Sequence, residues 1–178
     1  MRSIVLALLA VSAMACLSPP RPASGVPNTI LRIPQSLQTE HSAIHDALEE
    51  ATKAPGRVGA AARELAAILG PHFQREDEIA LPPLGLLVPL AAGEKPAGME
   101  EALAMTDALR KEWPRMLEEH KRIHAATEKL RTVALDEQAT VHARFAEELA
   151  AHARSEEEVL YPAAILVGDI IRTRTTQK

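Results

Sequence analysis

Apolar residues recur every three or four positions in four segments of the chain, which is the spacing of one buried helix face. Proline, glycine or a polar residue marks the ends of these segments, which run over about 35–53, 58–80, 99–133 and 137–160. We therefore predict four main helices. At 1.5 Å per residue, each helix of this length would be about 30 Å long.

Several residues modify this pattern. Pro71 and Pro114 lie inside predicted helices, where a missing backbone donor predicts a kink or a break. Asp136 is a suitable N-cap for the last helix, and Pro162 is expected to end it. Residues 81–98, rich in Pro, Gly and Leu, are expected to form a loop.

The connections and the composition indicate the fold class. Short links between the first two and the last two helices favour antiparallel neighbours. Hydrophobic residues make up 47% of the 178 positions, enough for one core, and only two Phe, one Trp and one Tyr are present, so helix formers dominate. The predicted fold is all-α, an antiparallel four-helix up-and-down bundle in one domain.

The N-terminal residues differ from the rest. Arg2 precedes an apolar run over residues 4–15, which is typical of a signal peptide and too short to span a bilayer. Cys16 follows the small residues of this run and resembles the lipobox cysteine of bacterial lipoproteins, so we expect it to be the lipidated first residue of the mature chain. The alternative is an ordinary cleavage site beside an unrelated cysteine. The expected location is exported, either periplasmic or membrane-anchored as a bacterial lipoprotein.

The remaining chain divides into three parts. Residues 16–33 are proline-rich and predict an extended linker, residues 34–172 the folded domain and residues 173–178 a tail. The apolar stretch over 163–171 is expected to pack back on the bundle. Because Cys16 is the only cysteine, an internal disulfide is excluded, and the core or a metal must hold the domain together.

Histidines and glutamates interrupt the apolar faces at matched spacings. Two segments carry Glu-His-x-x-Ile-His and two carry His-x-x-x-Glu, and the second copy of each motif follows the first at almost the same interval, which predicts an internal two-fold repeat. Residues four apart lie on the same helix face, so each helix directs one pair at the bundle centre. The eight candidate metal ligands are His41, His45, His72, Glu76, His120, His124, His152 and Glu156.

A metal centre explains why such residues lie among leucines. Burying these charges without compensation would cost several kcal/mol each. Histidine with carboxylate suits iron or another borderline transition metal, whereas ligand sets of oxygen alone suit magnesium or calcium, and a cysteine-rich structural zinc site has no ligands here. Two carboxylates from opposite helices are well placed to bridge two metal ions.

These motifs resemble those of the hemerythrin family, including its bacterial HHE cation-binding domains, over roughly residues 34 to 162. The resemblance implies two Fe ions in a non-haem di-iron centre with an oxo or hydroxo bridge. The implied ligands are His41, His72, Glu76, His120, His124, His152 and Glu156. Glu156 is preferred to Glu157 as the bridging carboxylate because it mirrors Glu76. His45 is a departure, since oxygen carriers usually have an apolar residue there.

The resemblance also implies a function. We expect a binding protein, rather than a dedicated enzyme, that binds or reacts with dioxygen or a related small ligand in sensing, carriage or scavenging. A di-iron oxidase or peroxidase, a nitric oxide handling enzyme, and an iron storage or delivery protein are the alternatives. An eighth ligand from His45 would fill the open iron position and argue against reversible oxygen carriage.

Charge and the remaining aromatic residues limit the classes of partner and the roles that we expect. The net charge of −4 is spread along the chain without a basic stripe, so nucleic acid is not an expected partner, and membrane contact is expected only through the lipid anchor. Trp113 and Tyr161 are interpreted as packing residues rather than electron relays.

Overall fold

The computed structural model describes residues 31–176, which form helices joined by short connections. The longer helices are α1 (Gln35–Lys53), α2 (Gly56–Ile79), α4 (Met99–Asp136), α5 (Thr140–Ser155) and α6 (Tyr161–Thr176). Three short elements complete the order: the 3₁₀ helix η1 (Pro82–Leu86), α3 (Leu87–Ala91) and the π-helix η2 (Glu156–Leu160). The predicted signal peptide, Cys16 and most of the linker lie outside the described residues. Within residues 31–176, no helix is long and apolar enough to span a membrane.

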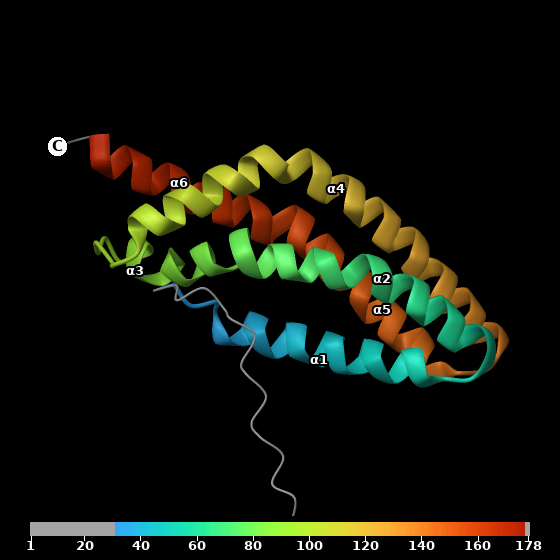
Figure 1. Ribbon diagram of the computed structural model, residues 1–178. Coiled ribbons are helices and arrows are strands. Elements are labelled where there is room, and N and C mark those ends of the chain that lie inside the picture. The colour runs from blue at the N-terminus through green and yellow to red at the C-terminus, as the bar shows by residue number, and fades with distance from the viewer. Residues whose placement is uncertain (1–30, 177–178) are drawn as a thin grey trace, which may run out of the picture.

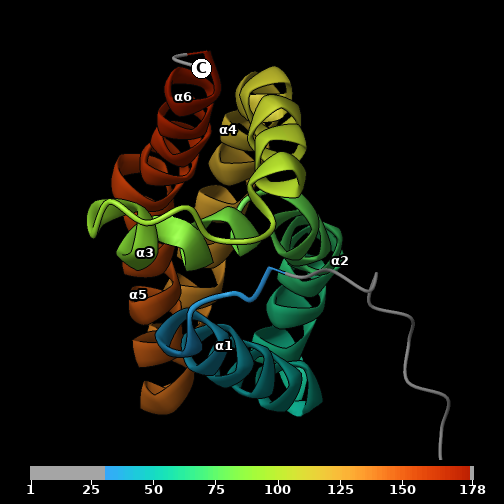
Figure 2. The same ribbon diagram turned by 90° about the vertical axis from the view of Figure 1, so that its left-hand side faces the viewer.

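Helices α1, α2, α4 and α5 form a bundle of four helices (Figure 1). The chain turns back between α1 and α2 and again between α4 and α5, and each of these pairs packs side by side. Contacts between α2 and α4 and between α1 and α5 complete the ring. Helix α3 and the loop after it lie across the opposite end of the bundle, in front in Figure 2, and lead into α4.

Glycines allow two of the short connections. Gly56 begins α2 with a φ of 67°, and Gly98 precedes α4 with a φ of 84°. Both values lie in the left-handed region, where a side chain is disfavoured. Arg63 donates a 2.7 Å hydrogen bond from its guanidinium to the carbonyl oxygen of Thr52, which partners one of the free carbonyls at the end of α1.

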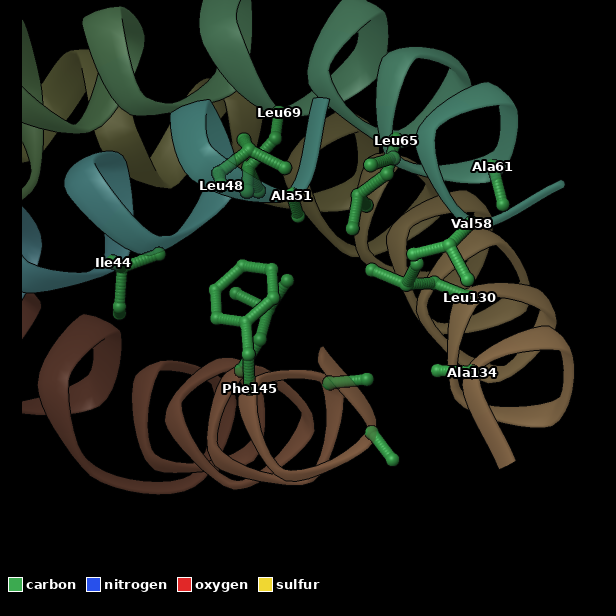
Figure 3. Packing of buried hydrophobic residues seen from close by; sticks show 14 of the residues in the cluster. Ile44, Leu48, Ala51, Val58, Ala61, Leu65, Leu69, Leu130, Ala134 and Phe145 are labelled. Carbon is green, nitrogen blue, oxygen red and sulfur yellow. The ribbon is translucent and has the colours of Figure 1, made fainter. Parts of the chain in front are cut away.

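Apolar side chains of all four bundle helices meet near the α1–α2 and α4–α5 turns. Phe145 lies at the centre of this cluster, with Ile44, Leu48 and Leu69 around it (Figure 3). A second cluster, which includes Leu81, Met116 and Tyr161, lies farther toward the other end of the bundle. All of the predicted metal ligands except His45 and His124 fall between the two clusters along the helices, so apolar packing on both sides positions them.

The helical path does not end at Pro162, so that prediction was wrong. The backbone N–H of Tyr161 bonds the carbonyl of Glu156, five residues earlier, and α6 then continues to residue 176. Pro162 falls in the first turn of α6, where proline is tolerated because an N–H is not required. Helix α6, which contains the apolar stretch over 163–171, packs against α4 and η1.

The structure also differs from the sequence pattern at several single residues. Pro71 and Pro114 lie within α2 and α4 without splitting them, although α4 is visibly arched in Figure 1. Asp136 ends α4 rather than capping the next helix. Val159, within η2, is 56% exposed, because the π-turn rotates it away from the face that it would share with His152 in a regular α-helix.

Candidate metal centre

Six of the eight predicted ligands converge in two groups. The first group consists of His72, Glu76, His120 and Glu156, and the second of His41, His152 and Glu156. Within each group, one ligand atom from every residue lies within 4.8 Å of all the others. All six residues are buried. Glu156 belongs to both groups, so its carboxylate can bridge two metal ions.

The first group has the dimensions of a coordination shell. His72 Nε2 lies 2.8 Å from His120 Nε2 and 3.4 Å from Glu76 Oε1. Glu156 Oε2 is 3.5 Å from His120 Nε2. Metal–nitrogen bonds of about 2.1 Å place neighbouring ligands of an octahedron about 3 Å apart. A modest contraction around a cation would therefore bring these atoms into coordination distance.

The second group uses the other oxygen of the shared carboxylate. Glu156 Oε1 lies 2.7 Å from His152 Nε2 and 3.4 Å from His41 Nε2. The buried ring of Phe73 packs beside this group, with its centroid 4.9 Å from that of His41. The two oxygens of Glu156 therefore face different imidazoles, as a bridging carboxylate requires.

Carboxylates hold the outward-facing nitrogens of three histidines. His72 Nδ1 lies 3.1 Å from Glu119, and His152 Nδ1 lies 3.0 Å from Glu40. His120 Nδ1 lies 2.8 Å from Glu157. A carboxylate accepts the Nδ1 proton and leaves the Nε2 lone pair free for a metal, an arrangement found behind most histidine ligands.

Glu40 and Glu119 were not among the predicted site residues. The signal was present, since each directly precedes a candidate histidine in the repeated Glu-His motif. The structure shows that each holds a histidine of another helix rather than its neighbour: Glu119 reaches from α4 to His72 on α2, and Glu40 from α1 to His152 on α5.

Buried atoms without hydrogen bonds support a cation site. In the described part of the chain, five buried side-chain nitrogen or oxygen atoms have no hydrogen bond of acceptable geometry. Four of them belong to the two groups: His41 Nε2, Glu76 Oε2, His152 Nε2 and Glu156 Oε1. Unpaired buried polar atoms are costly, and native proteins have few. Their concentration here fits ligands that partner a metal ion.

Burial and charge shift the pKa values of these residues. Burial, together with repulsion from Glu156, raises the pKa of Glu76 to about 7. Burial disfavours the charge on Glu156 too, but the adjacent imidazoles of His152 and His41 outweigh it and lower the pKa of Glu156. Burial opposes protonation of His152, but contacts with Glu156 and Glu40 raise its pKa to about 9. Without a bound cation, an ionised Glu156 is thus balanced by a protonated His152.

His45 and His124 lie outside both groups. His45 is exposed, and its ring lies 4.8 Å from that of Phe73. The side chain of His124 is 33% exposed, with Nε2 3.5 Å from Glu157 Oε1. Four residues carry a helix about 6 Å along its axis and about 40° past a full turn. Both members of each His-x-x-x-Glu pair reach the centre at this same spacing, so the spacing alone does not exclude His45 and His124; each lies about one turn along its helix from the histidine that is level with the carboxylates.

Tyr161 is a site residue that sequence reasoning interpreted only as packing. The residue is fully buried, and its hydroxyl donates a hydrogen bond to Glu76 Oε1. The same oxygen lies 3.3 Å from His72 Nε2 and 3.2 Å from His120 Nε2. The sequence did not indicate this contact, because residues five apart do not share a face in a regular α-helix. The π-turn between Glu156 and Tyr161 brings the two to one face.

Comparison with known proteins identifies the family. The profile of the hemerythrin HHE cation binding domain matches residues 32–164, which is most of the chain and includes every residue of both groups. No curated protein and no solved structure matches. The family match and the buried His/Glu groups agree on a cation site. The chain therefore belongs to the hemerythrin family of HHE cation-binding domains.

Proposed function

We propose that the protein holds two iron ions in these groups and binds or reacts with dioxygen or a related small ligand, in sensing, carriage or scavenging. The observation that carries the proposal is the shared carboxylate of Glu156, whose two oxygens face imidazoles of different groups. Four imidazoles and two carboxylates form a nitrogen-rich, moderately anionic ligand set, which suits iron and disfavours magnesium and calcium.

Each part of the site has a separate task. The carboxylates of Glu40, Glu119 and Glu157 orient histidines so that their Nε2 atoms face inward. The apolar ring of Phe73 limits water beside the second group. Iron bound in this pocket would supply electrons and coordination positions for the small ligand.

The position of His45 supports small-ligand binding. An eighth ligand from His45 would argue against an open coordination position, but His45 is exposed and outside both groups. The second group offers only three ligand residues, so a six-coordinate metal there would retain positions for an exogenous molecule.

We further propose the antiparallel arrangement, the internal repeat and the export of the protein. The turns between α1 and α2 and between α4 and α5 favour antiparallel neighbours, and the recurrence of both motifs at almost the same interval favours the repeat. The apolar N-terminal run and Cys16 favour a lipid-anchored protein of the bacterial cell envelope.

Anaerobic reconstitution with ferrous iron tests the proposal. We expect two iron ions per chain, one for each group, by metal analysis and Mössbauer spectroscopy. His45→Ala is the matched control and should bind the same amount, whereas Glu156→Ala should lose both ions. A wild-type content of one iron or less per chain, or a preference for zinc over iron in competition, would refute the di-iron assignment.

Reaction with dioxygen then separates the functions. A colour change that reverses under vacuum indicates carriage or sensing. Irreversible oxidation with repeated turnover in the presence of a reductant indicates an oxidase or peroxidase. Accumulation of ferric iron beyond the two sites indicates storage. The absence of any reaction with dioxygen or nitric oxide would contradict the proposed ligand class.

A further inference from the structure

We propose that Tyr161 is a further metal ligand, whose phenolate oxygen binds the metal of the first group and makes the two metal positions chemically unequal. The inference rests on the proposed two-metal function. On metal binding, the O–H bond of Tyr161 breaks, an oxygen–metal bond forms and the proton is released to solvent, so the step involves no oxidation or reduction.

Geometry is the first argument. The hydroxyl oxygen of Tyr161 lies 3.3 Å from His72 Nε2 and 3.2 Å from His120 Nε2, and these two nitrogens are 2.8 Å apart. Neighbouring corners of an octahedral shell with bonds of about 2.1 Å are separated by about 3 Å. Tyr161 therefore occupies a corner of the same shell. An oxygen at the metal position itself would lie about 2.1 Å from each nitrogen.

The hydrogen-bond partners of these groups also favour a cation between them. Glu119 and Glu157 lie within hydrogen-bond distance of Nδ1 of His72 and His120, so each Nδ1 can donate its proton outward and the two Nε2 atoms face each other. The Tyr161 hydroxyl has one proton, which it donates to Glu76, and turns its remaining lone pairs toward the same space. A single proton between the two imidazoles can hold the 2.8 Å contact in the metal-free protein, and a cation bound by all three groups takes the place of that proton. A tyrosine buried only for packing needs a single partner, which Glu76 already supplies.

The backbone supplies the third argument. The π-helix η2 lies between Glu156 and Tyr161, and the Tyr161 N–H bonds the Glu156 carbonyl across five residues. The turn adds a residue to the helical register, which places Tyr161 on the ligand face. Single π-turns within α-helices are uncommon and frequently occur at functional sites. The ring, with its centroid 5.5 Å from that of His120, is held in the second apolar cluster.

The other half of the chain has no equivalent ligand. Tyr161 follows Glu156 across the π-turn, and at the same distance after Glu76 the first half of the repeat has Leu81. Leucine cannot bind a metal, so the second group keeps only its three ligand residues. With Tyr161, the first group offers five ligand residues to a six-coordinate metal and the second offers three, so most of the open positions lie at the second, beside Phe73. This asymmetry specifies where the proposed small ligand would bind.

The chain provides a direct test, because Tyr161 is its only tyrosine. Any tyrosinate-to-iron charge-transfer band in the oxidised iron protein, and any phenolate ring mode in its resonance Raman spectrum, must come from this residue. We expect both signatures in the wild type and complete loss of both in Tyr161→Phe, which keeps the ring and removes the oxygen. His45→Ala should retain both. Circular dichroism and iron content verify that Tyr161→Phe remains folded and loaded.

The outcomes separate the inference from the function on which it rests. A wild-type protein that carries two ferric ions but lacks the tyrosinate signatures overturns the inference and leaves the two-iron proposal intact; Tyr161 would then be a hydrogen-bond donor to Glu76. Retention of the signatures in Tyr161→Phe would also overturn it. Failure of the wild type to bind iron overturns both proposals.

Discussion

Glu76 and Glu156 should respond in opposite ways to the same substitution. Both are buried carboxylates of one centre, but the pKa of Glu76 is raised to about 7, chiefly by burial, whereas the imidazoles of His152 and His41 lower that of Glu156 against the effect of burial. In the metal-free protein, an ionised Glu76 therefore destabilises the fold, while an ionised Glu156 stabilises it. Glutamine, which has nearly the same shape and no charge, tests the difference.

The magnitude follows from proton linkage. A rise from 4.5 to about 7 means that folded Glu76 holds its proton more tightly than the unfolded chain, so stability falls as the pH rises through this range. At about 1.4 kcal/mol per pKa unit, the loss reaches about 3 kcal/mol at pH 8 and less than about 1 kcal/mol at pH 5. Because an uncharged amide escapes this loss, Glu76→Gln should raise the melting temperature at pH 8 by roughly 6–12 °C, at about 2–4 °C per kcal/mol.

Thermal melts of EDTA-treated proteins at pH 5 and pH 8, followed by circular dichroism, measure the effect. Glu156→Gln is the matched control and should melt below the wild type at pH 8, since the lowered pKa of Glu156 gives stability that is present above its unfolded value and lost only as the pH falls through the folded one. Added iron should stabilise the wild type more than either variant, because each substitution removes a carboxylate ligand. A metal-free Glu76→Gln protein that melts below the wild type at pH 8 would refute the reasoning.

Four further predictions follow from the same structure. Glu119→Gln and Glu40→Gln should each weaken metal binding by about 10- to 100-fold, measured by competition with a chelator, because each orients one histidine; unchanged affinity in both would contradict that role. Removal of the bound metal with a chelator should lower the melting temperature, because the ligands come from all four bundle helices and metal binding is therefore coupled to folding. The difference in melting temperature between the metal-loaded and the chelated protein should grow with the free metal concentration in the loaded sample. Phe145→Ala should destabilise the protein by about 3–5 kcal/mol in urea unfolding, because it empties the centre of the first apolar cluster; a loss below about 1 kcal/mol would show that the cluster collapses into the space. His45→Ala should leave the iron spectrum and azide affinity unchanged, and increased azide binding would place His45 among the ligands after all.

Apolar periodicity was sufficient to predict most of the fold. The first helix was predicted over 35–53, and α1 has these bounds. The ends of α2 and α4 differ by a few residues from their predictions. The spacing of apolar residues shows which face of each helix is buried, and this spacing can be read from the residues of that helix alone. The π-turn escaped this reasoning because it changes the hydrogen-bond register without changing the composition, which exposed Val159 and brought Tyr161 inward.

The site was predictable as far as helix faces determine it. The His-x-x-x-Glu pairs needed no further information, since both members of each pair reach the centre. The His-x-x-x-His pairs did need further information, because the position along the bundle axis at which neighbouring helices meet decides which histidine is level with the carboxylates. His41 and His120 are at that height, whereas His45 and His124 are not. Contacts between helices, such as Glu119 with His72, depend on the same information.

The division of ligands between the two groups bears on how such a chain could have arisen. The first group joins α2 with α4 and η2, and the second joins α1 with α5 and η2. A protein with only the first half of the sequence would contain His41, His72 and Glu76 but could complete neither group alone. Two copies related by a two-fold axis would complete both at their interface. If the proposed repeat arose by fusion of such copies, the halves would have been free to diverge, and Tyr161 opposite Leu81 is a difference that a symmetric dimer could not have had.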